Sequence, residues 1–503
     1  MAGAKTARGR KNIQALAATP SLLQKMDIFS DQSSDSVSVI GGTVRVLYWE
    51  SMLSDSIRSS VTFTDAGNTL RSTKQTRRGR RPSKKKVSAV EGLPITGGER
   101  VALKFTDNNG NTLDFSDKNN NSLYINQLIP LPTGSETTDK SYMLDLTSLE
   151  YINNEGGKTR VRKCMSGQIS DHVKDIFEKV LKTEKDLDIE QTSSTLDYIP
   201  NNTKPFYCLN ELSTKAVKGK AGETAGYFFW ETADSFHFKS IDTLMAQGHK
   251  IKVLYNESTG KPPKPYNVKA LKMETSNKVN VQKKNERGAY SNKTEVIDPF
   301  NLVITNQINA AEAFAKGNEV KLAGAELPTL NKAFSSDEPG KDYTYVSFQL
   351  ASSGQLNYGP IKDQLSKSKE INFNASTTFN QSKMRYNQLF AAEITIVIPG
   401  DFSLHAGDSV WMDIPQTDTS QTKSCGDDVS QLDGGKYLIT DLCHQITARE
   451  TYTKLIMIRD SFGRKGSPTK GSLLSGSGRD AQGKSRHDLG MSKKEWNEYR
   501  RSQ

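Results

Sequence analysis

Short runs of β-branched and aromatic residues, separated by Gly, Asn and Asp, constrain this chain more than any other feature. In the N-terminal third they are TVRVLYWE (43–50), SIRSSVTFTDAGN (56–68) and ERVALKFTDNNGN (99–111). Near the C-terminus they are EITIVIPG (393–400), KYLITDLCHQITA (436–448) and TYTKLIMIRDS (451–461). Strands at such short intervals, joined by turn signals such as Asn109-Gly110, favour an antiparallel β-barrel or β-sandwich. The N-terminal unit of this kind covers about residues 37–160.

The hydrophobic period changes after Cys164, where apolar residues recur at helical spacing. One helix is predicted around residues 169–181, with Ser166 or Ser170 as its cap. A second is predicted to start at Thr203, because Pro205 then occupies the first turn. GYFFWETADSFHFKS (226–240) predicts a β-hairpin, whereas residues 256–375 are polar and weakly patterned apart from a short strand at 343–350. The buried stripes are expected to be Ile169, Val173, Ile176, Phe177, Val180 and Leu181 in the first helix, and Phe206, Leu209, Leu212 and Ala216 in the second.

Size and composition indicate a polar protein with more than one core. The chain has 503 residues, of which 35% are hydrophobic, and single cores stop growing at roughly 250–300 residues. No apolar run approaches the ~20 residues needed to span a bilayer, so no membrane anchor is expected. The four cysteines show no C-x-x-C spacing. We therefore expect neither a zinc site nor a disulfide framework, and a reduced intracellular folding compartment.

Positive charge is concentrated in three segments. Residues 74–86 carry +8, residues 1–26 carry +5 and residues 464–503 carry +6, which leaves −8 for the rest of a chain whose total is +11. A nucleic-acid-binding fold spreads basic residues over a folded face instead. The N-terminal segment is interpreted as an extended contact arm rather than a transit peptide. The C-terminal one is predicted to be a Gly/Ser/Lys linker ending in a short helix with a capping box at Ser492 and Glu495, which is either a docking element or a frayed end.

The stretch KQTRRGRRPSKKK (74–86) is the one candidate contact site. Without periodicity or acidic residues, it is typical of a solvated insertion between two strands. In the functional interpretation it clamps DNA, an acidic protein or a membrane, since arginines make bidentate phosphate contacts. No aromatic residue is interleaved, so any nucleic-acid contact is expected to involve the backbone only and to be salt-sensitive. The candidate partner- or phosphate-contacting residues are Arg77, Arg78, Arg80, Arg81, Lys84, Lys85 and Lys86.

No catalytic signature is present. GGKT (156–159) resembles the end of a phosphate-binding loop, but the first glycine of that motif falls at Ile152. Cys443 and His444 are adjacent in a predicted strand, so their side chains point to opposite faces and cannot share a metal. His237 is interpreted as a surface residue of the hairpin. We therefore predict no catalytic residue, no cofactor, no metal and no enzymatic activity.

Six segments carry a resemblance to a known family, in pattern and order rather than in a short motif. They are VRVLYWESMLSDSIRSSVTFTDAGN, CMSGQISDHVKDIFEKVLK, IPNNTKPFYCLNELSTKAV, GYFFWETADSFHFKSIDTLM, FSLHAGDSVWMDIP and KYLITDLCHQITARETYTKLIMI. From about Val44 to Ser461, the chain resembles the central baseplate hub proteins of contractile-tailed, T-even-like bacteriophages.

The resemblance implies a mainly β fold with α/β insertions (α+β), in which two tube-type antiparallel β-barrel domains are interrupted by inserted mixed domains. No repeat between residues 44–160 and 393–461 is visible in the sequence. The implied units are a basic N-terminal arm (1–36), a first barrel with the basic insertion 74–86 (37–160), an inserted α/β domain (161–224 plus 263–375), a second barrel (225–262 plus 376–462) and a flexible basic tail with a short terminal helix (463–503).

The resemblance further implies a structural virion protein. Three copies are expected to form a ring at the end of the tail tube, which adapts the sixfold tube to the threefold cell-puncturing spike and lines part of the DNA channel. The implied location is the tail baseplate of the virion, after assembly in the host bacterial cytoplasm. The implied partners are further copies of the chain, the trimeric spike, tail tube or tube-initiator proteins, the tape-measure protein in the lumen, baseplate wedge proteins, and genomic DNA in transit only.

Two other functions are compatible with the residues. One is a β-barrel module that binds nucleic acid or carbohydrate through residues 74–86. The other is a tail-associated cell-wall hydrolase, whose pair of acidic residues lies far apart in the sequence.

Overall fold

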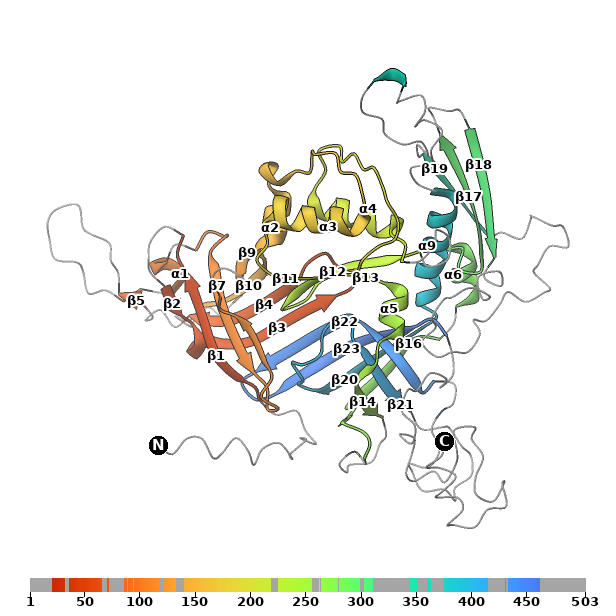
Figure 1. Cartoon of the computed structure of the whole chain (residues 1–503). Helices are drawn as coiled ribbons and strands as arrows, with labels where there is room; N and C mark the ends of the chain where they lie inside the picture. Colours follow the sequence, from red (N-terminus) through yellow and green to blue (C-terminus); the bar gives the residue numbers. More distant parts are fainter. Residues whose placement is uncertain are drawn as a thin grey trace, which may run out of the picture.

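In the described chain β-strands are about twice as abundant as helices, at 48% against 22%, so the expectation of a mainly β fold is confirmed (Figure 1). Fifteen of the described strands form one continuous sheet. The predicted C-terminal tail (463–503) lies outside the described residues, as do most of the arm and of the 74–86 insertion. The structure, a computed structural model, describes residues 20–31, 36–65, 70–71, 86–87, 89–93, 95–117, 121–132, 140–218, 225–255, 262, 264–278, 280–298, 303–310, 344–350, 360–362, 375–414, 430 and 433–461.

One group of strands, which we call the N-terminal strand set, occupies six positions in the sheet, because β2 and β3 together fill one of them and β8 is an addition. The pairings run β1–β7–β9–β10–β4–β3, all antiparallel, and β2, which pairs with β1, leads through Ile40–Gly42 into β3. Alternating burial along β4 shows how the sequence period selects the inner face, where Val61 and Phe63 are buried. The strands are β1 (Leu22–Phe29), β2 (Ser36–Ser38), β3 (Thr43–Ser51), β4 (Arg58–Asp65), β7 (Arg100–Thr106), β9 (Leu123–Leu131) and β10 (Lys140–Ser148), with β8 (Thr112–Phe115) added to β7.

A second group, the C-terminal strand set, encloses its own core. The pairings run β14–β21–β22–β23–β20–β16, and β15, which pairs with β14, precedes β16 by only two residues. Ile396, Met412, Tyr437 and Leu455 are fully buried in its interior. The strands are β14 (His249–Leu254), β15 (Val268–Lys269), β16 (Lys272–Lys278), β20 (Ala392–Pro399), β21 (Ser409–Asp413), β22 (Gly435–Thr447) and β23 (Thr451–Arg459).

The two sets repeat one pairing order. When β2–β3 and β15–β16 are each counted as one bent strand, each set has six strands, which we number in chain order. In both sets the first strand pairs with the second and the fourth. The third pairs with the second and the sixth, and the fifth pairs with the fourth and the sixth. Even a register shift recurs, because Asn126 in the fifth strand β9 and Thr440 in the fifth strand β22 interrupt the ladder to the sixth strand. The sets differ in the direction of their first strand: β14 runs parallel to its neighbours, whereas β1 runs antiparallel to its neighbours.

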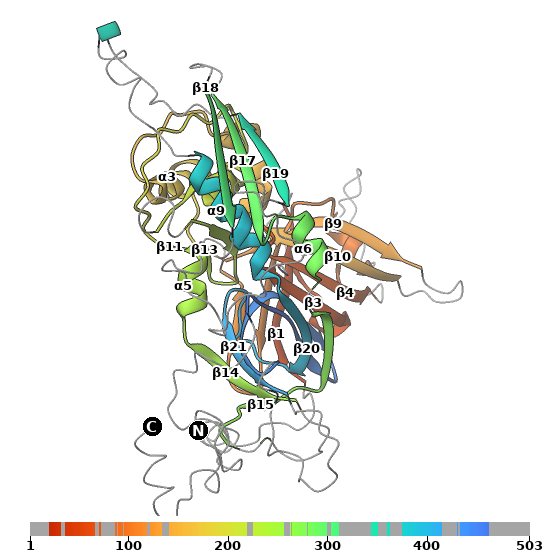
Figure 2. The same ribbon diagram turned by 90° about the vertical axis from the view of Figure 1, so that its right-hand side faces the viewer.

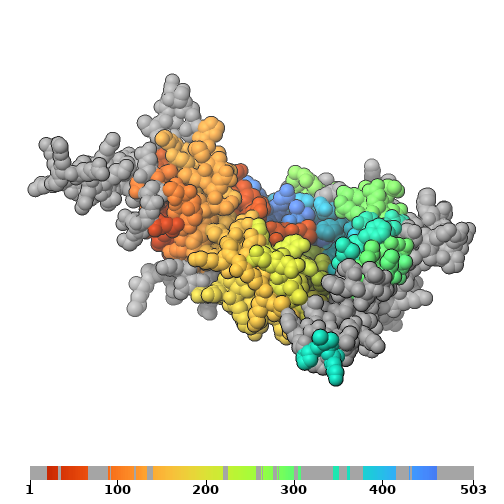
Figure 3. Space-filling view, turned by 90° about the horizontal axis from the view of Figure 1, so that it is seen from above, coloured from red at the N-terminus to blue at the C-terminus, as the bar shows by residue number. Residues whose placement is uncertain are grey.

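Direct strand pairing joins the two sets. β3 and β22 pair antiparallel over seven residues, from Arg45 opposite Thr447 to Ser51 opposite Asp441. We call this ladder the seam. In the view of Figure 3 the red and orange N-terminal set lies beside the blue strands of the C-terminal set along the long dimension of the molecule.

A helical unit covers one side of the sheets and contains most of the predicted helices. The predicted helix at 169–181 is present as α3 and a π-helical segment, and the predicted hairpin is β12–β13, which pairs with β11. α4 begins with Pro205 in its first turn as predicted, but its N-cap is Lys204 rather than Thr203. The cap of α3 is Gln168, not a serine. The elements are α2 (Leu149–Glu155), α3 (Ile169–Asp175), the π-helical segment (Ile176–Leu181), β11 (Asp186–Ile189), α4 (Pro205–Lys215), β12 (Tyr227–Glu231) and β13 (Ser235–Ser240).

A smaller sheet and the long helix that packs on it lie beside this unit (Figure 2). β19 and β18 flank β17, and the long helix α9 contacts β17, β18 and α4. The strand predicted at 343–350 is therefore present as β19. The elements are α6 (Val281–Glu286), β17 (Ser291–Asp298), β18 (Val303–Ala310), β19 (Tyr345–Leu350) and α9 (Ala375–Leu389), while α5 (Ile241–Ala246) links β13 to β14 and α1 (Ala89–Gly92) precedes β7.

Three segments pair outside the units to which the sequence assigned them. Residues 22–29, expected in the arm, are strand β1 against β7. Residues 227–240, expected in the second barrel, pair with β11 beside the helices. Residues 268–278, expected in the inserted domain, pair with β14 and β20. In each case the partner strand is distant in the sequence, so local composition does not indicate it.

Candidate functional site

The predicted contact residues are described only at their edge. Arg77, Arg78, Arg80, Arg81, Lys84 and Lys85 lie outside the described residues. Lys86 belongs to β6 (Lys86–Val87), which pairs antiparallel with β5 (Leu70–Arg71). Residues 74–85 therefore connect the two strands of a separate two-stranded sheet, and the contacts of the insertion stay a prediction.

Three separate parts of the described chain meet instead at a buried carboxylate, that of Glu50. It lies near the end of β3, where the two-residue period places it on the same inward face as Val46 and Tyr48. The turn of the β12–β13 hairpin, at Ala233, and the loop between β20 and β21, at His405, reach the same point. Glu50 thus lies where the two strand sets and the helical unit meet.

Both oxygens of Glu50 accept several hydrogen bonds. Oε1 accepts from the Tyr48 hydroxyl at 2.8 Å and from the Ala233 amide at 2.9 Å. Oε2 accepts from the Ala406 amide at 2.9 Å, and Nδ1 of His405 lies 3.0 Å from Oε1. Burying a carboxylate is costly unless it is paired and hydrogen-bonded, and this one is both. We call Glu50, Tyr48, Ala233, His405 and Ala406 the junction.

The junction holds two opposite charges with strongly shifted pKa values. Burial alone raises the pKa of Glu50, but the His405 charge and the hydrogen bonds outweigh it and lower the pKa to about 2. Burial lowers the pKa of His405, but the charge of Glu50 and its hydrogen bond raise the pKa to about 9. The pair is therefore ionised on both sides at neutral pH, and it joins β3 to the β20–β21 loop.

A second buried carboxylate fastens the helical unit to the N-terminal strand set. Glu231, at the end of β12, accepts hydrogen bonds from the Ile57 amide at 3.1 Å and from the Ser148 hydroxyl at 2.9 Å. Lys185 donates to its other oxygen at 2.5 Å, and both side chains of this ion pair are almost fully buried. Desolvation raises the pKa of Glu231 against the attraction of Lys185. These contacts fix the hairpin on the sheet without a solvent-exposed reactive group.

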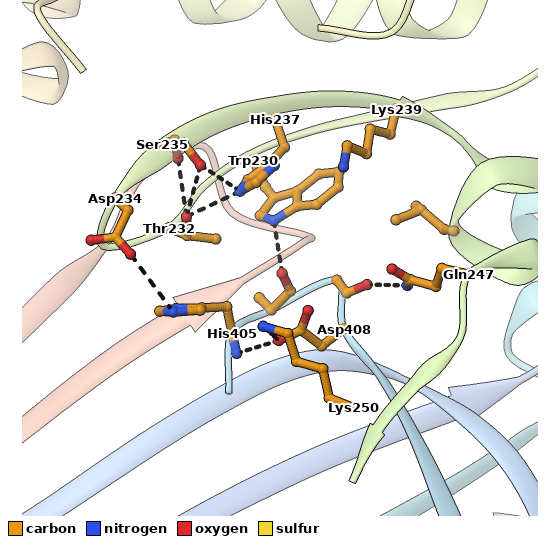
Figure 4. A pocket seen from close by; sticks show the side chains of 13 residues that line it. Trp230, Thr232, Asp234, Ser235, His237, Lys239, Gln247, Lys250, His405 and Asp408 are labelled. Carbon is orange, nitrogen blue, oxygen red and sulfur yellow. Dashed lines mark hydrogen bonds and ion pairs between the residues drawn. The ribbon is translucent and has the colours of Figure 1, made fainter. Parts of the chain in front are cut away.

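The junction borders a pocket of about 130 Å³ between the hairpin, α5 and the β20–β21 loop (Figure 4). Nε1 of Trp230 donates to the Ala406 carbonyl at 3.0 Å, and Lys250 forms an ion pair with Asp408 at 2.7 Å. Gly407 has a φ of +91°, and a Cβ there would lie 2.5 Å from Cζ2 of Trp230. Only glycine therefore allows this loop to pack on the indole.

A hydroxyl, an imidazole and a carboxylate lie in hydrogen-bonding order beside this pocket. Nε2 of His237 is 2.9 Å from the Ser235 hydroxyl, and its Nδ1 is 3.0 Å from Asp188. The order is that of a nucleophile, a base and an orienting carboxylate. However, the hydroxyl of Thr232 is also 3.0 Å from Nε2, and Asp188 also pairs with Lys239 at 2.5 Å. We assign these contacts to holding β11 and β13 in register, and note that His237 is half-buried rather than on the open surface.

The described residues offer little other chemistry. They contain no group of three or more His, Cys, Asp or Glu side chains that could hold a metal ion. None of their helices is long and apolar enough to cross a membrane. His444 is buried, its Nδ1 is 2.9 Å from the Thr453 hydroxyl, and burial lowers its pKa to about 3. Cys443 points to the other face, as predicted for neighbours in a strand.

Sequence reasoning missed Glu50 and His405 as a pair. They are 355 residues apart, and no spacing rule connects them. One signal was available: Glu50 falls on the apolar side of a strand whose alternate residues Val46 and Tyr48 are hydrophobic. A carboxylate in that position needs a buried partner, although the sequence does not say which residue supplies it.

No protein-family model matches this chain. No curated protein matches it either. Its fold is similar to that of a tail protein from Neisseria meningitidis MC58, at 7% identity and a TM-score of 0.46, covering 87% of this chain and 96% of that one. For the 43 kDa tail protein of prophage MuSo2 from Shewanella oneidensis the identity is 9% and the TM-score 0.44, covering 87% of this chain and 99% of that one.

A third similar structure is a component of the type VI secretion system from E. coli, described as structurally similar to the T4 tail proteins gp27 and gp5. The identity is 10% and the TM-score 0.38, covering 89% of this chain and 81% of that one. The three structures are thus two phage tail proteins and a component of a secretion system.

Proposed function

We propose that this chain is a structural protein of a phage tail, namely a baseplate hub whose three copies form a ring at the end of the tail tube. The observation that carries the proposal is the repeated pairing order of the two strand sets. Each set encloses a separate hydrophobic core, which supports two tube-type β-barrels in one chain. Three copies then present six similar barrels to a sixfold tube, while the assembly keeps threefold symmetry for a trimeric spike.

A ring of this kind needs heterologous contacts, in which one surface of a copy meets a different surface of the next. The chain is suited to that task because the seam already joins two barrels side by side through backbone pairing. The junction and the Glu231–Lys185 pair hold the helical unit in a fixed position on the barrels. These features support a load-transmitting scaffold without catalytic activity.

The remaining parts of the proposal concern partners and boundaries. The two barrels comprise the N-terminal and C-terminal strand sets, with the helical unit and the β17–β19 sheet as inserted mixed domains. The proposed partners are the spike, tail tube or tube-initiator proteins, the tape-measure protein, wedge proteins and passing DNA. The basic segments 1–26, 74–86 and 464–503 fasten acidic neighbours, and the acidic remainder lets DNA slide by without sticking.

The mass of the purified chain tests the proposal. Multi-angle light scattering, with and without the spike protein, is expected to give about three times the 55.7 kDa monomer mass in at least one of the two conditions. A monomer or a dimer in both conditions would overturn the ring. Neutralising the charges of the 74–86 insertion is expected to leave this mass unchanged, because the segment fastens neighbours rather than copies of the chain.

A further inference from the structure

One edge of β22 pairs with two different strands in succession. Residues Gly435–Leu438 pair with β21 of the same strand set. After the irregularity at Thr440, residues Asp441–Thr447 pair with β3 of the other set. On this edge the fifth strand of the C-terminal set thus pairs with the second strand of the N-terminal set, while its other edge stays paired with β23.

The fifth strand of the N-terminal set, β9, begins in the same way. Leu123 and Tyr124 pair with β7, as Tyr437 and Leu438 pair with β21. The irregularity at Asn126 then occupies the place of Thr440. From Gln127 to Leu131, however, β9 pairs with β10 on one side and with no other described strand on its second edge. In Figure 2, β9 and β10 extend away from the rest of the sheet.

The strand equivalent to β3 is β16, and it also has an edge that no described strand occupies. β3 pairs with the third strand β4 and with β22, whereas β16 pairs with the third strand β20 alone. The registers are equivalent as well. Leu47 lies opposite Ser60, and Glu274 lies opposite Thr395. Ser60 pairs with Asp145 in the sixth strand β10, and Thr395 pairs with Ile456 in the sixth strand β23. Asp145 and Ile456 each lie immediately beside the irregularity of their ladder.

Burial agrees with this equivalence. At the seam Tyr48 and His444 are fully buried and stack with ring centroids 6.1 Å apart. Their counterparts, Thr275 in β16 and Pro130 in β9, are exposed in a single copy. The positions that are covered at the seam are therefore open at the two free edges, which lie on opposite sides of the seam in Figure 1.

We propose that β16 of one copy pairs antiparallel with residues 127–131 of β9 in the next copy, repeating the seam between subunits. This inference rests on the ring of the proposed function and assigns its subunit interface. The register of the seam places Leu131 opposite Glu274 and Pro130 opposite Thr275 of the neighbouring copy. The contact is heterologous, so it propagates from copy to copy until the ring closes. An unpaired strand edge is a template for such pairing, and Pro130, without an N–H, limits the ladder at this point.

Engineered cysteines test the register. Residues directly opposite each other in an antiparallel pair have Cα atoms ~4.5–5.5 Å apart, which suits a disulfide. The double variant Leu131→Cys/Glu274→Cys is expected to lose its monomer band under oxidising conditions and to give covalent dimers and trimers that reducing agent reverses. The matched control Leu131→Cys/Thr275→Cys shifts one cysteine to the other face of the strand and is expected to stay monomeric on the same gel. Each single variant controls for the native cysteines.

Amide hydrogen exchange on the unmodified chain provides the second measurement, which does not depend on the variants folding. In the trimer, exchange is expected to slow in 127–131 and in 272–278 relative to the chain at concentrations where it dissociates. If light scattering shows a trimer but neither cross-linking nor protection follows, the strand pairing is wrong and the ring stands. Equal cross-linking of both cysteine pairs would also overturn the register. A chain that is never trimeric overturns the ring and the pairing together.

Discussion

Replacing Glu50 by glutamine tests whether the junction holds the parts of the molecule together. The substitution keeps the size of the side chain but removes the charge that pairs with His405. It also puts an NH₂ group where an oxygen accepted hydrogen bonds. Since Oε1 accepts from the Ala233 amide and Oε2 from the Ala406 amide, either orientation of the glutamine directs a donor at a backbone N–H.

The expected size of the effect follows from the pKa of Glu50, which is held at about 2 in the fold. An exposed glutamate has a pKa of ~4.3, and each unit of difference corresponds to ~1.4 kcal/mol, so ionised Glu50 contributes about 3 kcal/mol to the free energy of unfolding at neutral pH. Removing one partner of a buried ion pair costs ~3–5 kcal/mol, which agrees with that value. We therefore expect Glu50→Gln to lower the free energy of unfolding by about 3–5 kcal/mol.

Urea unfolding followed by tryptophan fluorescence measures this loss, because Trp230 lies beside the junction. The control is Glu450→Gln, an exposed carboxylate at the β22–β23 turn, for which a change within ~0.5 kcal/mol is expected. In a double-mutant cycle with His405→Gln, the two losses are expected to be far from additive. A loss below about 1 kcal/mol for Glu50→Gln, or additive losses in the cycle, would show that the Glu50–His405 pair does not stabilise the junction.

Three further results are expected. Because Glu50 has a lowered pKa and His405 a raised one, their contribution to stability is complete between about pH 4.5 and 6.5, and falls below that range as Glu50 protonates and above it as His405 loses its proton near pH 9. His405→Gln should flatten the alkaline loss in a pH series of unfolding midpoints, and an unchanged alkaline limb would contradict the assignment. Lys185→Met leaves the buried Glu231 without its cation, so a loss of about 3–5 kcal/mol is expected in the same urea assay, against little change if the pair is dispensable. Ser235→Ala should leave hydrolysis of a chromogenic ester at the rate of the unmodified chain, and a fall of tenfold or more would show that the hydroxyl beside His237 is a nucleophile.

The sequence predicted most individual elements because their patterns are local. Alternation in SVTFTD selected the inner face of β4, and the 3.6-residue stripe of Ile169, Val173 and Ile176 selected the buried side of α3. β1 was missed because its basic, acid-poor surroundings suggested an arm. Yet Met26 and Ile28, two residues apart, are both buried, so its alternation was present in the sequence.

The family resemblance implied two barrel domains, but the residues themselves do not show the repeated pairing order, because pairing order is not a property of any single segment. β9 and β22 share a position in the sheet and an irregularity, but LYINQLIPL and GKYLITDLCHQIT share no motif. The junction was hidden for a related reason. The pKa values of Glu50 and His405 are shifted by each other's charge and by hydrogen bonds, against the effect of burial, and these contacts depend on the packing of three separate parts of the chain.

Electron microscopy of the assembled protein, viewed along its axis, distinguishes the proposed ring from other assemblies. We expect a closed ring of three copies in which six barrel-sized densities surround a channel, with alternate densities distinguishable by the attached helical units. A ring with one barrel density per copy, or particles that never close, would contradict the claim that the repeated strand sets serve to match threefold to sixfold symmetry.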